Sequence, residues 1–424
     1  MSFELGLLLA VFAGLVIIDA PIAVALGLAS VIYLLVADLA PLMVVAQRMI
    51  AGIDSFTLLA IPLFLLAGML MVHGGLAPRI VNLCAALVGR ARGGLAIVMI
   101  AACMLFGSLS GSGVADVVAI GTMMLPSMRE RGYDPAFSAA ALGCAGSLGT
   151  VIPPSIVLIV YGTATGSSIG QLFIGAIIPG LLLGLALMLV AWWISGRHGW
   201  RGGQPTTARG LRDAAISAIP ALIAPLIIVG GIRFGVFTPT EAAGAGVIYA
   251  LIVGGLFYRS LGWGQIRTIL QDTTEMTGAI LLVIASASVF GWILAAEQVP
   301  QMAVNAILGL TESAVIALIL MMLVVLLLGT FMESLAIILI LAPVFTPVLA
   351  AYEINTVYFG ILLCINLAIG ANTPPLGIDL MAASRTAGIP MSATLGHLLP
   401  FLGAMVAVLF LLILFPQIIM GVIG

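Results

Sequence analysis

The segment GSLGTVIPPS occupies residues 146–155, and a second segment of similar character, IGANTPPLG, occupies residues 369–377. Each one interrupts a long apolar run with a Pro-Pro pair that follows glycine and small polar side chains. Proline lacks a backbone N–H and disfavours helical geometry in the residue before it, so each pair predicts a break in a helix. Glycine lets the chain turn sharply at the same point. The sequence therefore predicts two broken helices with backbone carbonyls that lack helical partners.

The two breaks belong to a longer internal repeat with an offset of 221 residues. Average proline usage is about 5%, so several prolines that coincide at one offset are improbable by chance. Just upstream, Gly107 in FGSLSGSG (106–113) pairs with Gly329 in GTFMES (329–334) at an offset of 222. We interpret the chain as a duplication. The other coincident pairs are Gly149 with Gly370, Pro153-Pro154 with Pro374-Pro375, Gly175 with Gly396, Pro179 with Pro400 and Pro126 with Pro347.

Composition places both halves in a membrane. Of the 424 residues, 63% are hydrophobic and only 7% are charged. A soluble domain of this size could not hide that much apolar surface from water. The 50 glycines and 21 prolines predict frequent helix interruptions, which a bilayer tolerates only where protein or a wet cavity satisfies the freed backbone. We expect an all-α polytopic membrane protein.

Arginine supplies all of the side-chain cations apart from histidine, because the sequence contains no lysine. Cytoplasmic loops of membrane proteins are enriched in Lys and Arg. If the arginines apart from Arg48 and Arg233 are cytoplasmic, both termini lie outside. The cytoplasmic set is Arg79, Arg90, Arg92, Arg129, Arg131, Arg197, Arg201, Arg209, Arg212, Arg259, Arg267 and Arg385.

This orientation requires two segments to enter and leave the membrane on the same side. We expect them to be re-entrant helical hairpins at about 93–130 and 313–350. Arginines flank the first, whereas Glu312 and Glu353 flank the second, so the two halves should have opposite orientation. Inverted repeats of this kind place solute and ion sites near the midplane, at the repeat interface. We divide the chain into a first repeat at 1–196, a cytoplasmic linker at 197–213 and a second repeat at 214–424.

Several other classes of protein are disfavoured. The net charge of −2 and the absence of a basic tract give no reason to expect a nucleic acid partner. An intramembrane enzyme usually needs paired Asp residues, a metal motif, or Ser with His or Lys, and we find no convincing dyad. We find no repeated pore loop of the kind that forms a channel filter. The four cysteines (Cys84, Cys103, Cys144 and Cys364) and three histidines (His73, His198 and His397) lack metal-type spacing.

The two hairpin tips and the two breaks are where we expect function. Unwound carbonyls together with Ser, Thr and Asn oxygens form a ligand shell suited to a desolvated alkali cation. One tip facing one break in each half predicts two cation sites. Close helix packing is the alternative role for these glycines and serines.

Ionisable residues inside a membrane segment are costly and often mark a transport pathway. Asp116 and Glu333 follow the two tips, where a carboxylate could complete a cation site, carry a proton or cap a half-helix. Asp379 follows the second Pro-Pro pair. Arg385 comes one and a half turns later and could hold a substrate carboxylate or extend to cytoplasmic water.

Over essentially its whole length the chain resembles the large membrane subunit of tripartite ATP-independent periplasmic (TRAP) transporters. The most specific shared stretches are FGSLSGSGVADVVAIGTMMLP (106–126), GTVIPPS (149–155), FTPTEAAG (237–244) and NLAIGANTPPLG (366–377). The resemblance implies a small membrane subunit of about four spans and a periplasmic binding protein that delivers an organic anion, typically a dicarboxylate or sugar acid. It also implies sodium coupling, a multi-pass location in the bacterial inner membrane among its lipids, and an elevator-type movement of the hairpin-containing domain.

Residues that match the family pattern give two candidate sodium sites, formed largely by backbone oxygens. The first comprises Ser108, Ser110, Gly111, Gly146, Thr150, Val151 and Pro153. The second comprises Gly329, Thr330, Glu333, Gly370, Asn372, Thr373 and Met381. We expect the substrate between the tips, near Ser112, Asp116, Ser155, Asp379 and Arg385, the last on grounds of charge alone. A standalone sodium- or proton-coupled carboxylate carrier that needs no binding protein is the alternative function.

Overall fold

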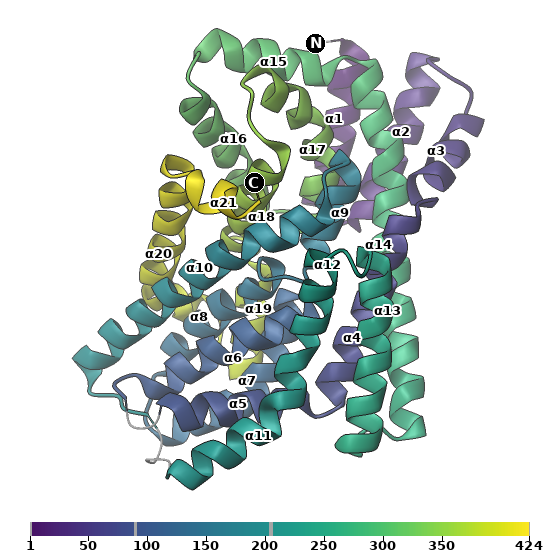
Figure 1. Ribbon diagram of the computed structural model, residues 1–424. Coiled ribbons are helices and arrows are strands. Elements are labelled where there is room, and N and C mark those ends of the chain that lie inside the picture. Colours follow the sequence, from purple (N-terminus) through teal and green to yellow (C-terminus); the bar gives the residue numbers. More distant parts are fainter. Residues whose placement is uncertain (1, 89–90, 203–206, 424) are drawn as a thin grey trace.

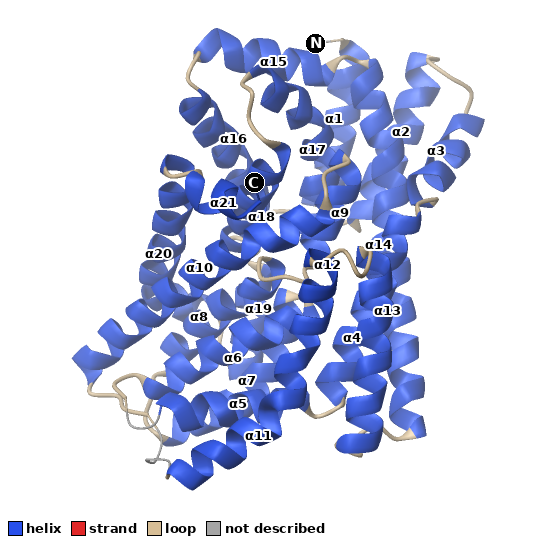
Figure 2. Ribbon diagram, viewed as in Figure 1, coloured by secondary structure: helices blue, strands red, loops and turns tan. Residues whose placement is uncertain are grey.

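The computed structural model describes residues 2–88, 91–202 and 207–423. Within these ranges the regular structure is helical, apart from an isolated bridge between Arg92 and Arg201, as Figure 2 shows. Seven helical stretches there are long and apolar enough to cross a membrane. The longest are Ile169–His198 and Trp263–Ala296. The expected all-α polytopic fold class is confirmed. Arg90, which we assigned to the cytoplasm, and residues 203–206 of the expected linker lie outside the described residues.

The first half contains one hairpin and one broken helix (Figure 1). The hairpin is formed by α6 and α7, and the broken helix by α8, the short turn η2 and α9. Their bounds are α1 Phe3–Ile17, α2 Ile22–Ala37, α3 Met43–Ile53, η1 Phe56–Leu59, α4 Ala60–His73, α5 Leu76–Val88, α6 Gly94–Ser110, α7 Gly113–Glu130, α8 Pro135–Gly146, η2 Ser147–Thr150, α9 Ile156–Thr165 and α10 Ile169–His198.

The second half contains the same motif, with a hairpin formed by α16 and α17 and a helix broken between α18 and α19. The bounds are α11 Ala208–Pro225, η3 Leu226–Gly230, α12 Gly231–Arg233, α13 Pro239–Leu251, η4 Ile252–Phe257, α14 Trp263–Ala296, α15 Val299–Leu310, α16 Ala314–Gly329, α17 Ser334–Ala351, α18 Thr356–Gly370, α19 Ile378–Ala387, η5 Met391–Thr394, α20 Leu395–Leu414 and α21 Gln417–Ile423.

Helix boundaries recur at the offset seen in the sequence. Helix α7 begins at Gly113 and α17 begins at Ser334, which lies 221 positions later. The same offset relates the ends of these two helices and the starts of α8 and α18. Both Pro-Pro peptide bonds, Pro153-Pro154 and Pro374-Pro375, are cis. The two repeats therefore share their architecture as well as their prolines.

In each repeat a glycine of the hairpin tip touches a glycine of the break. A Cβ atom built on Gly107 would lie 2.7 Å from the Cα atom of Gly149. In the second repeat, a Cβ atom on Gly370 would lie 2.9 Å from the Cα atom of Gly329. Real Cβ atoms do not come this close to backbone, so only glycine allows each tip to reach its broken helix. These four glycines therefore allow close helix packing, which is the alternative role given to them in the sequence analysis.

We expect Gly370→Ala to lower the free energy of unfolding by about 1–3 kcal/mol, because the added methyl group overpacks a contact made by backbone. The atoms it would meet are Cα, C and O of Gly329, which cannot swing aside as a side chain would. Denaturant titration of the purified protein in detergent measures the change. Gly403→Ala is the matched control, since a Cβ atom there would meet nothing within 4 Å. Equal stability of the two variants would contradict the contact.

The described arginines of the expected cytoplasmic set include several at the end of the molecule that carries α5 and α11, opposite the N-terminus (Figure 1). There the loop after α7 meets the chain that follows α10. The Arg131 guanidinium donates to the Gly202 carbonyl at 3.4 Å, and the Tyr133 hydroxyl donates to the Arg201 carbonyl at 3.2 Å. The rings of Tyr133 and Trp200 stack at 5.1 Å between centroids. These contacts join the base of the first hairpin to the start of the predicted linker.

Candidate functional site

Both hairpin tips and both broken helices border one cavity of about 160 Å³. Two helices outside the hairpin motifs, α4 and α14, contribute apolar side chains to its wall. The described lining residues are Leu65, Gly111, Ser112, Gly113, Val114, Thr150, Ile156, Val157, Met276, Ile280, Glu333, Ser334, Leu335, Ala371, Ile378 and Asp379. Segments that lie more than 200 residues apart thus converge on a single central cavity.

Four helices begin at the central cavity. Its lining includes the first residue of each, namely Gly113 of α7, Ile156 of α9, Ser334 of α17 and Ile378 of α19. The first N–H groups of a helix have no intrahelical partner, and the helix dipole places partial positive charge at the same end. Convergent helix N-termini therefore favour an anion. None of the described lining residues is basic, so here the backbone supplies the attraction for an anion.

The residues predicted for the first sodium site lie together where the first tip meets its break. Ser108 and Ser110 end α6 and are buried. A Cβ atom on Gly111 would lie 3.0 Å from the Pro154 carbonyl oxygen, and one on Gly146 would lie 3.0 Å from the Gly113 carbonyl oxygen. Val151 and Pro153 are also buried in this break.

Hydroxyl groups in the first tip and the first break are already engaged with backbone. The Ser108 hydroxyl donates to the Leu105 carbonyl at 2.6 Å, and the Thr150 hydroxyl donates to the Ser147 carbonyl at 2.7 Å. The Ser155 hydroxyl donates to the Thr150 carbonyl at 2.5 Å and, as the N-cap of α9, accepts from the Leu158 N–H at 3.4 Å. The oxygen lone pairs of Ser108 and Thr150 remain available to a cation, because these hydroxyls direct their hydrogens to carbonyls.

The second tip and break meet in the same way. The Leu376 N–H donates to the Thr330 carbonyl at 3.0 Å, which ties the break to the tip directly after Gly329. The Thr373 hydroxyl donates to the Ile369 carbonyl at 2.8 Å. Asn372 is buried, whereas Glu333, the N-cap of α17, is exposed where it borders the central cavity.

Three buried side-chain oxygens near the tips have no hydrogen-bond partner in the described structure. They are Oδ2 of Asp116, Oδ2 of Asp379 and Oδ1 of Asn372. Burying an unpaired carboxylate oxygen is costly, so such atoms call for a proton or a cation. The other oxygen of Asp116 accepts from the Ser110 hydroxyl. These three oxygens are therefore free to accept a hydrogen bond or to contact a cation.

The carboxylate and the amide of the second break face the first repeat. A Cβ atom on Gly113 would lie 2.6 Å from Oδ2 of Asp379 and 2.9 Å from its Oδ1. A Cβ atom on Gly143 would lie 2.9 Å from Oδ1 of Asn372. Accordingly, α19 packs against both α7 and α8. Asp379 therefore joins the two repeats at the start of α7.

Sequence reasoning did not identify Leu65, Met276 and Ile280 as part of the site. They are ordinary apolar residues of α4 and α14, and nothing in their local sequence distinguishes a cavity wall from a lipid-facing surface. Gly113 was missed as a contact of Asp379, although the glycine pattern around the first tip was noted.

Two predicted residues lie at the margin of this arrangement. Arg385 is exposed in the last turn of α19 and is not among the described residues that line the central cavity. Met381 lies in the first turns of α19, where its N–H donates to the Gly377 carbonyl at 2.7 Å. The ligand role of Met381 and the substrate role of Arg385 stay predictions.

Comparison with known proteins decides the family. The profile of the tripartite ATP-independent periplasmic transporter, DctM component, matches residues 9–418. The chain belongs to this family. The resemblance to the large membrane subunit of TRAP transporters is thus confirmed over nearly the whole sequence, including both hairpins and both breaks.

Among its relatives, this TRAP permease is 38% identical to the sialic acid TRAP transporter large permease protein SiaM of Vibrio cholerae, with 95% of each chain covered. It is 39% identical to the C4-dicarboxylate TRAP transporter large permease protein DctM of Pseudomonas aeruginosa, covering 92% of this chain and 90% of that one. It is 40% identical to the isethionate TRAP transporter permease protein DctMQ of Oleidesulfovibrio alaskensis, covering 98% of this chain but only 65% of that longer protein.

The fold is also similar to a solved structure. The YdaH transporter of Alcanivorax borkumensis, described as having an unusual topology, matches with a TM-score of 0.59 and 88% coverage of each chain. The sequence identity is 16%, so this similarity concerns the fold alone.

Proposed function

We propose that this TRAP permease carries a small organic anion, of the dicarboxylate or sugar-acid type, into a bacterial cell in symport with sodium ions. The observation that supports this best is the central cavity, where both tips and both breaks meet and four helices begin. A transported anion would bind there between the tips. The proposed role is transport without chemical conversion of the solute.

The charges around the cavity support coupling to a cation. Glu333 and Asp379 border it, Asp116 is buried where the first tip meets its break, and no basic side chain is among the described lining residues. An anion that enters next to these carboxylates is repelled unless positive charge enters with it. Sodium bound at the breaks supplies that charge, and the unpartnered oxygens of Asp116, Asn372 and Asp379 offer it ligands.

We further propose that sodium binds first and fixes the position of the tips. The helix N-termini at the cavity then bind the carboxylate of the solute. Each ligand shifts the conformational equilibrium only by its differential affinity, so uptake without sodium should be slow rather than impossible. The hairpin-containing unit then moves as an elevator against a scaffold. We assign α14 to this scaffold, because it lies outside the hairpin motifs and lines the cavity with Met276 and Ile280.

The remaining parts of the proposal follow from family membership. A small membrane subunit of about four spans would accompany this chain, and a periplasmic binding protein would deliver the anion. The complex would reside in the inner membrane among its lipids. The clustering of arginines at the α5 and α11 end supports a cytoplasmic location for that end.

The decisive experiment is uptake into proteoliposomes that contain this chain with its small subunit. The labelled acids would be succinate, a sialic acid, 2,3-diketo-L-gulonate and isethionate, whose classes occur in the names of relatives. We expect uptake of at least one acid to require both an inward sodium gradient and the binding protein. Sodium-driven uptake without a binding protein would favour the standalone carrier, and sodium-independent uptake would contradict the coupling.

A further inference from the structure

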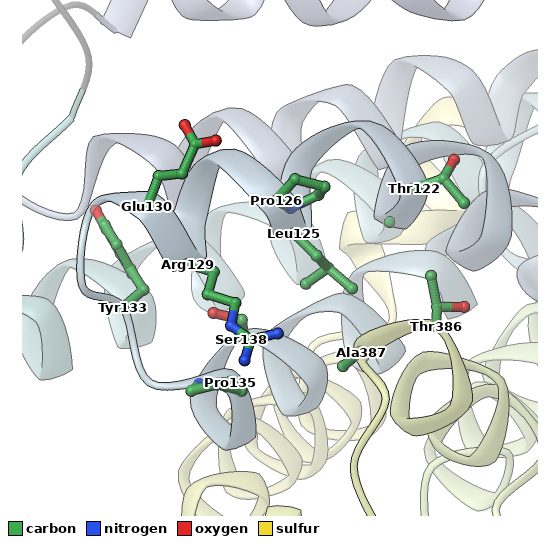
Figure 3. A pocket seen from close by; sticks show the side chains of 11 residues that line it. Thr122, Leu125, Pro126, Arg129, Glu130, Tyr133, Pro135, Ser138, Thr386 and Ala387 are labelled. Atoms are coloured by element: carbon green, nitrogen blue, oxygen red, sulfur yellow. The ribbon is translucent and has the colours of Figure 1, made fainter.

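A second and larger cavity, of about 650 Å³, lies between α7, α8 and α19 at the arginine-rich end (Figure 3). Its lining combines small, polar and charged side chains. The described residues are Gly121, Thr122, Leu125, Pro126, Arg129, Glu130, Tyr133, Pro135, Ser138, Thr386 and Ala387. We call it the basal cavity. Sequence reasoning attached no function to this region beyond the orientation of Arg129.

The basal cavity lies along the same two helices as the central cavity. On α7, Val114 borders the central cavity, whereas Leu125 and Arg129 border the basal one. These residues recur at helical spacing with Val118, which is 46% exposed, so they form one continuous face of α7. On α19, Asp379 and Thr386 lie two turns apart on one face and border the central and basal cavities respectively. The two helices pack against each other, so the central cavity lies at the starts of α7 and α19 and the basal cavity lies toward their ends.

Arg129 is the one basic residue among the described residues that line the basal cavity. Its side chain points toward Ser138, whereas the carboxylate of neighbouring Glu130 points away (Figure 3). Within the described chain no carboxylate forms a salt bridge with Arg129. Thr122 and Thr386 also line the cavity, but their hydroxyl groups donate to the Ala119 and Ala382 carbonyls of their own helices, at 3.1 Å and 2.8 Å. A guanidinium with free donors suits a carboxylate.

We infer that the basal cavity is a second, weaker binding site for the transported organic anion on its way to the cytoplasm, with Arg129 as its positive group. The inference rests on the proposed function. The central cavity holds the anion only while cations accompany it, and once these leave, the carboxylates there repel it. Arg129 offers the next favourable charge along α7, toward its end. Because Arg129 is exposed, its attraction is screened by salt, which keeps the site weak and allows release.

A charged thiol reagent tests the site without any knowledge of the solute. Leu125→Cys places a thiol in the lining one turn from Arg129, and the four native cysteines are buried. The probes are the anionic reagent sulfonatoethyl methanethiosulfonate and its cationic trimethylammonium counterpart. We expect Arg129→Gln to lower the ratio of anionic to cationic reaction rates by about fivefold, and Arg129→Lys to preserve it. An unchanged ratio in the Arg129→Gln variant would overturn the inference.

Two further arms control for charge elsewhere on the protein and for bound lipid. Arg212→Gln removes an exposed arginine of α11 that is not among the described residues lining the basal cavity, and it should leave the ratio unchanged. An anionic lipid headgroup could occupy the same site, so the reaction is run in phosphatidylcholine vesicles with and without phosphatidylglycerol. Protection of the thiol by phosphatidylglycerol would assign the cavity to lipid and overturn the release role.

Transport then tests whether the site is used. For each acid that the unaltered complex takes up, Arg129→Gln should raise the half-saturating internal concentration for exchange by about fivefold. Dependence on external sodium and on the binding protein should not change. If the unaltered complex moves none of the acids with sodium, the proposed function fails. If it does, and the variant matches it, only the present inference fails.

Discussion

Asp379→Asn should raise the sodium concentration that half-saturates uptake by about thirtyfold or more. Asp379 is 3% exposed, borders the central cavity and has an Oδ2 atom without a partner. Asparagine keeps the shape of the side chain and removes its charge. A carboxylate beside a cation in a partly screened interior contributes about 4 kcal/mol, and a loss of half of that amounts to about thirtyfold in affinity. Sodium titration of uptake in proteoliposomes measures the effect.

The Asp379→Asn substitution should weaken sodium binding but stabilise the protein when sodium is absent. Without sodium, Asp379 is a buried carboxylate with an unpaired oxygen, which disfavours the folded state. We therefore expect Asp379→Asn to raise the Tm in sodium-free buffer and to reduce the further increase that sodium gives the unaltered protein. Asp213→Asn is the control, because Asp213 is exposed beside Arg212. Equal sodium responses of the unaltered protein and the Asp379→Asn variant would refute a cation near Asp379.

The elements that could be predicted from sequence were those fixed by local chemistry. Pro153-Pro154 and Pro374-Pro375 interrupt their helices because proline cannot donate a backbone hydrogen bond, whatever surrounds it. The repeat could also be predicted, because matching residues such as Gly149 and Gly370 recur at one constant offset in the sequence itself. The helix bounds at each tip and break follow these signals closely.

The contacts between the repeats could not be predicted in this way. Asp379 faces Gly113, and Asn372 faces Gly143, across more than 200 residues of chain. The apolar wall made by Leu65, Met276 and Ile280 depends on where α4 and α14 pass. Hydrophobic pattern marks these residues only as membrane-compatible, so their place at the cavity is a consequence of tertiary packing. The same holds for Arg129, whose sequence context indicates an orientation and no cavity.

Gly113→Ala should reduce sodium-driven uptake by about tenfold to a hundredfold while leaving the protein folded. The added Cβ atom would lie 2.6 Å from Oδ2 and 3.0 Å from Cγ of Asp379, so the carboxylate must move or α7 must separate from α19. A shift of about 1 Å at a binding site can cost a hundredfold in rate. Because Gly113 is the first residue of α7, at a hairpin tip, the change leaves the interior of the helix intact.

Gly309→Ala is the matched control, since a Cβ atom there would meet nothing within 4 Å. The pairing of Gly113→Ala with Asp379→Asn adds a sharper test, because residues in contact show non-additive effects. If the alanine acts by displacing the carboxylate, it should cost far less once that charge is absent. Full additivity in uptake would instead mean that Gly113 acts independently of Asp379, and the proposed junction between the repeats at this point would be wrong.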